Sequence, residues 1–332
     1  SARPWIGGGN RNLTLTGNTF NGDRPLRIWD PDADVSGVSG NTYQSADAAA
    51  VLDGTLNADQ TRGVVDGLSR YVGDGYVWIR NGSTLTVTPG VRIEKPNSSY
   101  YIHVYEGSTL NATDVTFAST VNSSSDYVML LYDDQSGGSN GTLTNVTFEA
   151  SAAGSEPVLE IETGTNVTIN GGTVLNLQLE NASPTVTGVT FADADPIYAY
   201  HASGLSGFSG NTFVDPNAVI HVSGTINSDT TWGIVDGVNR YVLNGDVTVA
   251  DGATLTIAPG VEVHTPSTSY DINIYGTLLA DGVTFSGDAT DIDVQNGGDA
   301  DISNSALPWV GVGNGNLTLT GNTFNGDRPL RI

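Results

Sequence analysis

The chain has 332 residues, contains no cysteine and carries 36 acidic against 12 basic residues, for a formal net charge of −24. The absence of cysteine excludes a disulfide framework and a thiolate metal site. The negative charge argues against binding to nucleic acid, because phosphate recognition needs clustered positive charge. No run of about 18 apolar residues occurs, so the sequence predicts no membrane span.

Residues 1–28 contain the first predicted strand, Leu13–Thr16, in which apolar and polar side chains alternate. A corner, Gly17–Phe20, follows this strand, and related tetrapeptides recur along the chain. Each begins with Gly, Asn or Asp, which tolerate positive φ, has Thr third, and ends in an aromatic or apolar residue. Because neighbours in a strand point to opposite faces, each copy predicts a tight turn and then a strand with a buried ring. The nine copies are Gly17–Phe20, Gly40–Tyr43, Asp114–Phe117, Asn145–Phe148, Asn166–Ile169, Gly188–Phe191, Gly210–Phe213, Gly282–Phe285 and Gly321–Phe324.

Three carboxylates, Asp30, Asp32 and Asp34, stand at alternate positions just after this first segment. In an extended segment they lie on one face, which suits a hard cation such as Ca²⁺. The sequence is not an EF-hand loop, because Val35 stands where that loop needs glycine. A solvated acidic face is the simpler interpretation. Calcium at these aspartates is the one cofactor that the sequence suggests; otherwise we expect none.

Two related units follow, residues 36–205 and residues 206–332. Their segments match at an offset of 170 residues; for example, Leu85–Val91 corresponds to Leu255–Val261. The second unit runs into a further copy of the beginning of the chain. This internal duplication indicates a fold built by repetition along one direction.

The spacing of the corner rings predicts how the chain winds. Successive rings lie 23, 74, 31, 21, 22, 22, 72 and 39 residues apart, which fits a coil of about 23 residues. About 13 such turns fill a 304-residue period. Short alternating segments such as Tyr76–Ile79 and Thr254–Ile257 lie between the corners and predict strands. With neighbouring strands about 4.8 Å apart, one period would advance the axis by roughly 62 Å.

Asn-x-Ser/Thr motifs are candidate glycosylation sites, which would require an external surface. A chain rich in Asn, Ser and Thr also contains several such motifs by chance. They occur at Asn12, Asn81, Asn97, Asn111, Asn122, Asn140, Asn145, Asn166, Asn181 and Asn316.

The last 28 residues repeat the first 28. Residues 305–332 match residues 1–28 without a gap, at an offset of 304, and only 4 of the 28 positions differ. Residues 12–28 return unchanged as residues 316–332. The chain therefore holds one full period and the start of the next, and we interpret residues 1–332 as one continuous solenoid cut from a longer array.

The chain resembles right-handed parallel β-helix proteins, the pectate-lyase-like fold that many secreted surface proteins also have. The residues that carry the resemblance are the repeated Gly-Asn-Thr-Phe corners and the paired segments Gly82–Val91 and Gly252–Val261. The resemblance implies an all-β solenoid of parallel strands. The alternative is a row of β-sandwich domains, which would need hairpin turns and longer strands.

Strong acidity with Lys95 as the only lysine resembles surface proteins from very salty environments, where surface carboxylates keep a chain hydrated. A merely acidic secreted protein is the simpler interpretation. Both interpretations predict an extracellular or cell-surface location.

Polysaccharide lyases and hydrolases share the pectate-lyase-like fold, so an enzyme has to be weighed. Of the polygalacturonase-like motifs, only Asp133–Asp134 is present, and the four histidines are scattered along the sequence. Hydrolysis of a glycoside needs two carboxylates across the bond, and no pair is marked out. We therefore expect no enzyme and no catalytic residue.

Two functions from different classes remain. The first is a structural repeat of an extracellular filament, stalk or adhesin shaft, whose main partner is another copy of itself, head to tail. The second is a carbohydrate-binding or polysaccharide-processing β-helix with cell-surface glycans as partners. The second function predicts a cluster of Asp, Arg and aromatic side chains on one face.

Overall fold

The computed structural model describes residues 5–6, 13–28, 34–96, 102–119, 130–132, 137–150, 158–287, 291–307, 309–313, 315–325 and 330–331. None of these residues is helical. They form short parallel strands on successive coils, which confirms the predicted all-β parallel β-helix. The solenoid has about 11 turns, against about 13 per period predicted from the spacing. The coils differ in length; Asp114 contacts Asn145 of the next coil 31 residues later, at the spacing of 31 found in the sequence.

The chain folds as two compact units. Unit 1 comprises Ser1–Leu177 and Thr185–Thr190, and unit 2 comprises Gln178–Pro184 and Phe191–Ile332. The sequence repeats, by contrast, divide between residues 205 and 206.

The strands of unit 1 are β1 (Trp5–Ile6), β2 (Leu15–Thr16), β3 (Thr19–Phe20), β4 (Leu26–Ile28), β5 (Val38–Ser39), β6 (Thr42–Tyr43), β7 (Ala50–Leu56), β8 (Gln60–Arg62), β9 (Arg70–Ile79), β10 (Thr84–Val87), β11 (Arg92–Lys95), β12 (Ile102–Val104), β13 (Thr109–Thr113), β14 (Thr116–Ser119), β15 (Leu130–Tyr132), β16 (Asn140–Ala150), β17 (Leu159–Glu162), β18 (Asn166–Val174) and β20 (Thr185–Thr187). Two strands contain a unit boundary, β19 (Leu177–Glu180) and β21 (Thr190–Phe191).

The strands of unit 2 are β22 (Ile197–Tyr200), β23 (Phe208–Ser209), β24 (Thr212–Phe213), β25 (Ile220–Ile226), β26 (Thr230–Trp232), β27 (Arg240–Val249), β28 (Thr254–Ile257), β29 (Glu262–Thr265), β30 (Asp271–Ile274), β31 (Thr277–Asp281), β32 (Thr284–Gly287), β33 (Asp291–Val294), β34 (Asp299–Ser303), β35 (Ala306–Leu307), β36 (Trp309–Val312), β37 (Asn316–Thr320), β38 (Thr323–Phe324) and β39 (Leu330–Arg331).

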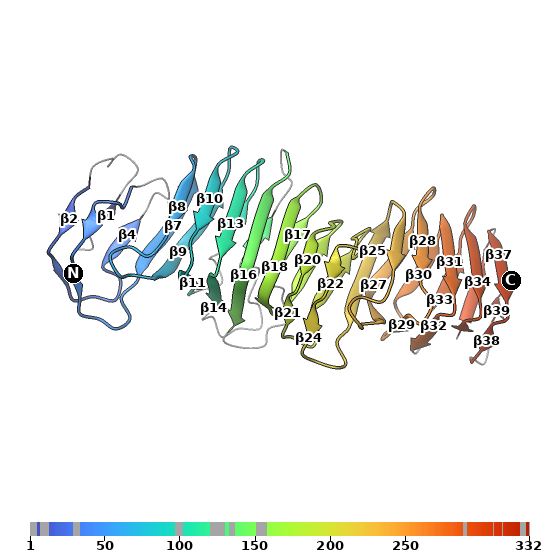
Figure 1. Ribbon diagram of the computed structural model, residues 1–332. Coiled ribbons are helices and arrows are strands. Elements are labelled where there is room, and N and C mark those ends of the chain that lie inside the picture. The colour runs from blue at the N-terminus through green and yellow to red at the C-terminus, as the bar shows by residue number, and fades with distance from the viewer. Residues whose placement is uncertain are drawn as a thin grey trace. The chain divides into compact units, whose positions relative to one another are not determined.

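Three parallel ladders run along unit 1, and Figure 1 shows their strands stacked coil by coil. One ladder is β8–β10–β13–β16–β18–β20, a second is β4–β7–β9–β11–β14–β16, and a third is β9–β12–β15–β17. Long strands such as β9 and β16 bend around a corner and so belong to two ladders. Because each strand pairs in parallel with the coil before and after it, equivalent side chains stack; Leu85, for example, lies opposite Leu110. The inward side chains form the core, and both of these leucines are almost fully buried.

Unit 2 repeats the local structure of unit 1 at the offset of 170 residues. Its ladders are β26–β28–β31–β34–β37, β25–β27–β29–β32–β35–β38 and β27–β30–β33–β36–β39. The Tyr71 hydroxyl donates a hydrogen bond to the Gly63 carbonyl over 2.8 Å, and the Tyr241 hydroxyl donates to the Gly233 carbonyl over 2.7 Å. The sequence duplication is therefore a duplication of structure, down to single hydrogen bonds.

The corners behave as their residue types predict. Eight of the nine first positions have positive φ: Gly17, Gly40, Asp114, Asn145, Gly188, Gly210, Gly282 and Gly321. Asn166 is the exception, and it begins the long strand β18 instead of turning. Asp66 holds one corner in place, accepting hydrogen bonds from the Gly40 and Asn41 amides at 2.7 and 2.9 Å. Asp236 does the same for the corresponding corner of unit 2.

Corner rings on neighbouring coils stack on one another. Phe117 and Phe148 are buried with ring centroids 5.2 Å apart and an interplanar angle of 18°. Phe191 and Phe213 stack at 5.0 Å in unit 2. Offset stacking of rings adds to the free energy gained by their burial.

Candidate functional site

The repeated segment, residues 1–28 and again residues 305–332, has a different neighbour in each of its two copies. In the copy near the C-terminus, β37 pairs with β34, which lies before the repeated residues, whereas β39 pairs with β36 inside the segment as β4 pairs with β1 in the first copy. The Asn316 amide donates to the Gly298 carbonyl, and the Asn304 amide donates to the Thr320 carbonyl, each over 2.9 Å. In this copy, the segment stacks on the coil that precedes it.

In the copy near the N-terminus, the opposite edge of the same segment is paired. There β2 pairs with β5, β3 with β6 and β4 with β7. The Thr42 amide donates to the Asn18 carbonyl over 2.7 Å, and the Leu15 amide donates to the Gly37 carbonyl over 2.9 Å. In this copy, the segment supports the coil that follows it.

The corner ring of the repeated segment differs in exposure between the copies. Phe20 stacks on Tyr43 of the following coil, with centroids 5.5 Å apart, and is half-buried. The same ring in the second copy, Phe324, is 37 % exposed. Among the described residues, no strand pairs with residues 316–325 on the edge that β5 and β6 cover in unit 1, and the Phe324 ring lies at this edge.

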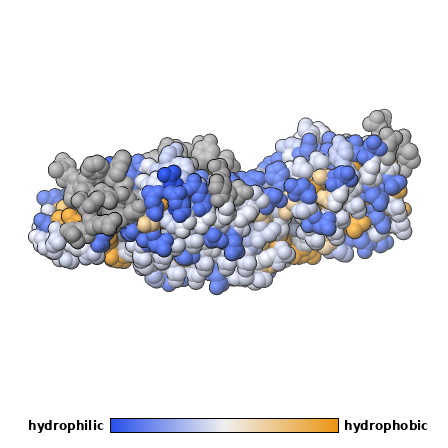
Figure 2. Space-filling model, turned by 90° about the horizontal axis from the view of Figure 1, so that it is seen from above, coloured by the Kyte–Doolittle hydropathy of each residue, from blue (hydrophilic) through white to orange (hydrophobic). Residues whose placement is uncertain are grey.

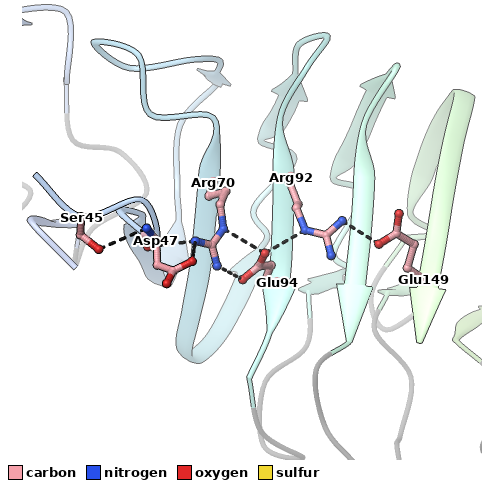
Figure 3. A network of polar contacts seen from close by, with 6 residues as sticks. All are labelled: Ser45, Asp47, Arg70, Arg92, Glu94 and Glu149. Carbon is pink, nitrogen blue, oxygen red and sulfur yellow. Dashed lines mark hydrogen bonds and ion pairs between the residues drawn. The ribbon is translucent and has the colours of Figure 1, made fainter. Parts of the chain in front are cut away.

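A ladder of ion pairs runs along the outer face of unit 1 (Figure 3). Glu94 lies at its centre and accepts hydrogen bonds from Arg70 Nη2 at 2.7 Å and from Arg92 Nε at 2.8 Å. Arg70 also contacts Asp47 at 3.7 Å, and Arg92 reaches Glu149 at 2.7 Å. The contacts join several coils through paired charges, which ties neighbouring coils together.

The pH dependence of this ladder follows from Glu94. Burial by itself raises the pKa of the Glu94 carboxyl, but the hydrogen bonds from Arg70 and Arg92 outweigh burial, so this pKa lies below its ordinary value of 4.5. An acid with a lowered folded pKa stabilises the fold above its unfolded pKa, and this contribution is lost as the pH falls through the folded value.

Glu94→Gln is therefore expected to lower the free energy of unfolding by roughly 1 kcal/mol at neutral pH and by much less at about pH 2.5. Urea unfolding at both pH values measures this difference. Glu149→Gln serves as the control, because Glu149 is half exposed and binds one arginine; its expected effect is within about 0.5 kcal/mol. An equal deficit for Glu94→Gln at both pH values would contradict the ionic role of Glu94.

A cluster of aromatic and basic side chains lies on another outer face of unit 1. This cluster, the aromatic patch, comprises Tyr76, Trp78, Arg80, His103 and Tyr105. Its ring centroids lie 5.7 Å apart for Tyr76 and Trp78, 4.9 Å for Trp78 and His103, and 4.6 Å for His103 and Tyr105. Sequence reasoning missed this patch. Trp78 and His103 lie opposite one another on adjacent coils, and the sequence alone does not give this register.

Two histidines of unit 2 each face a carboxylate. His221 Nε2 lies 2.9 Å from Asp195 Oδ1. His201 Nε2 lies 3.6 Å from Glu180 Oε2, and its Nδ1 accepts a hydrogen bond from the Thr225 amide at 3.0 Å. An Nδ1 that accepts must lack a proton, so Nε2 of neutral His201 carries the proton and points it toward Glu180. These are polar pairs on the coil surface.

Only one of the three predicted calcium ligands is described. Asp30 and Asp32 lie outside the described residues. Asp34 accepts a hydrogen bond from the Ser36 amide at 2.8 Å, and this bond holds the pKa of Asp34 below its ordinary value. Within the described residues, no three His, Asp or Glu side chains are placed to hold a metal ion together. Calcium binding stays a prediction.

The candidate glycosylation sites fall on the outside of the coils where they are described. Asn81, Asn145, Asn166 and Asn316 are exposed. Half-buried positions are Asn111, Asn140 and Asn181, whereas Asn12, Asn97 and Asn122 lie outside the described residues. The face shown in Figure 2 is mostly hydrophilic, with hydrophobic residues in small separate areas. Glycosylation stays a prediction.

The described part of the chain contains no helix with the length and apolar character needed to cross a membrane. No protein-family model matches the chain, and neither a curated protein nor a solved structure matches it. The function is therefore inferred from the residues and their geometry.

Proposed function

We propose that this chain is a structural repeat of an extracellular filament, stalk or shaft, in which one period of the β-solenoid continues into the next. The observation that carries the proposal is the repeated segment. Its two copies share residues 12–28 and 316–332 unchanged, yet one stacks on a preceding coil and the other supports a following coil. One sequence is thus compatible with neighbours on both edges, which is what the inner coil of an array requires.

The next coil has a defined place to bind. If residues 29–332 followed residue 332, the strands equivalent to β5 and β6 would pair with residues 319–320 and 323–324 as they do in unit 1. The ring equivalent to Tyr43 would then cover Phe324 as Tyr43 covers Phe20. Covering the open edge also removes the unpaired strand that invites irregular aggregation.

The chemistry of the chain supports an external location. The chain has no cysteine that could be oxidised, has a net charge of −24, and carries several exposed Asn-x-Ser/Thr motifs. A high negative charge keeps a long repetitive surface hydrated and prevents filaments from sticking side by side. We propose that the filament serves a mechanical role without catalysis.

Proteins of one, two and four periods, made by appending residues 29–332 after residue 332, test the proposal. Negative-stain electron microscopy is expected to show straight particles that lengthen by the same increment with every added period, at about 4.8 Å per turn, and keep a constant width. In the control, a Gly/Ser linker of equal length replaces the shared segment, residues 316–332, and the particles are expected to bend freely there. Two-period particles that bend as freely as the linker control would contradict a continuous solenoid. Immunogold labelling of the native cells tests the location, and label confined to the cell interior would contradict the external role.

A further inference from the structure

The aromatic patch lies on two adjacent coils of unit 1; the rings of Tyr76, Trp78 and Tyr105 reach solvent at least in part, whereas His103 is buried. Trp78, on β9, lies opposite His103, on β12, in the parallel register. Tyr105 follows β12, and its ring centroid lies 5.5 Å from that of Trp78. Tyr76 is 40 % exposed, and Trp78 and Tyr105 are partly exposed. The Arg80 guanidinium lies at the edge of the patch, with Nη1 3.5 Å from the Tyr105 hydroxyl.

The fold does not need these rings. The equivalent strands of unit 2, β27 and β30, pair in the same register, with Thr248 opposite Asn273 at the positions of Trp78 and His103. Asp246 and Ala250 replace Tyr76 and Arg80, and only Tyr275 keeps its aromatic character. Unit 2 therefore forms the same coils with small or polar side chains at most of these positions. The coil geometry does not require the rings of unit 1. Tyr76, which is exposed, also gains little stability from burial.

We propose that the aromatic patch of unit 1 binds a glycan. The C–H groups of a pyranose ring carry partial positive charge and pack against the negative faces of aromatic rings. Sugar hydroxyls need hydrogen-bond partners beside the rings, and Arg80 and the tyrosine hydroxyls supply them. Rings on neighbouring coils, about 4.8 Å apart along the axis, give an extended surface that suits a chain of sugars.

Other ligand classes fit the patch less well. An organic cation would be attracted to the rings, but the positive charge of Arg80 stands at their edge. A nucleic acid could stack its bases on the rings, but the net charge of −24 repels its phosphates. A glycan needs ring faces and hydrogen-bond donors without a strong positive field, which is the combination that this patch offers.

Isothermal titration of the full 332-residue chain with the uncharged oligosaccharides cellohexaose, chitohexaose, mannohexaose and xylohexaose tests the proposal. At least one of these oligosaccharides is expected to bind. The variant Trp78→Thr/His103→Asn, which installs the unit 2 residues Thr248 and Asn273 at these positions, is expected to weaken that binding about tenfold or more. Tyr275→Ala, at the position in unit 2 that corresponds to Tyr105, is the matched control and is expected to leave binding unchanged.

Circular dichroism and the midpoint of urea unfolding show whether the double variant keeps its fold. If the double variant does not fold, the titration uses Tyr76→Asp in its place. This substitution changes an exposed ring to the residue that unit 2 has at the equivalent position, Asp246. Binding that survives in a folded variant of the patch would overturn the assignment, as would the failure of all four oligosaccharides to bind. Neither result bears on the continuation of the solenoid, because the patch lies away from the repeated segment.

Discussion

Replacing Gly172 with alanine is expected to destabilise unit 1 by about 3–5 kcal/mol, a large effect for the addition of a single methyl group. Gly172 lies within β18 opposite Val146 of the preceding coil and has a φ of +87°. A Cβ atom there would overlap the backbone carbonyl oxygen and amide nitrogen of Val146. Neither atom can move without breaking the ladder between the two coils, so steric overlap adds to the strain of a left-handed residue.

Gly188→Ala separates the two contributions. Gly188 also belongs to unit 1 and has a positive φ of +63°, but the nearest atom to an added Cβ is 4.0 Å away. Only backbone strain applies there, so the expected loss is about 1–2 kcal/mol. Urea unfolding followed by circular dichroism measures both variants. Equal losses would show that coil contact at Gly172 is looser than the structure indicates.

Phe148→Ala is expected to cost about 3–5 kcal/mol. The Phe148 ring is 2 % exposed and stacks on Phe117 of the preceding coil, so its removal leaves a cavity inside a closed coil that cannot collapse freely. Because solenoids unfold in parts, the effect is best measured as the loss of amide protection in β14, β16 and β18 by hydrogen exchange.

Phe324→Ala is the control for this variant, since Phe324 occupies the same position in its corner tetrapeptide. In the 332-residue chain its ring is 37 % exposed, so its removal is expected to cost less than about 1 kcal/mol. A cost for Phe148→Ala as small as that for Phe324→Ala would contradict the ring stack as a source of stability.

The fold was predictable because its local rules repeat. The corner tetrapeptides required a residue that tolerates positive φ, and eight of their nine first positions have it. The alternation of Thr and Phe predicted a buried fourth residue at each corner, and Phe117, Phe148, Ile169, Phe191 and Phe285 are buried. The prediction is wrong in degree at the other corners, where Phe20, Tyr43 and Phe213 are half-buried and Phe324 is exposed. The number of turns was less predictable, because insertions lengthen single coils without changing the pairing of their neighbours.

The outer faces of the coils were not predictable to the same degree. Arg27 binds Asp53 at 2.9 Å and Asp74 at 2.8 Å, and these residues lie on neighbouring coils. The residues 170 positions after the two aspartates are Ser223 and Asn244, so the internal repeat gives no hint of the ion pairs. Contacts of this kind depend on the register between coils and on side-chain direction, whereas the core depends only on alternation.

The aromatic patch illustrates the same limit. Trp78 and His103 are 25 residues apart in the sequence and become neighbours only once the coil step at this point is known. The repeat comparison aligns Trp78 with Thr248, which favours neither packing nor binding by itself. The replacement of Trp78 by Thr248 indicates a role outside the core only once the structure shows both residues on equivalent outer faces.

Amide hydrogen exchange of residues 316–325, compared between the one-period and the two-period protein, tests the continuity of the solenoid most directly. In unit 1 the Leu15 amide donates to Gly37 of the following coil, and Leu319 is the equivalent residue in the second copy of the segment. Stacking of a further coil is expected to slow exchange at Leu319 and its neighbours in the two-period protein, to the level of residues 13–20. Equally fast exchange of residues 316–325 in both proteins would contradict the proposal that one period is built to continue into the next.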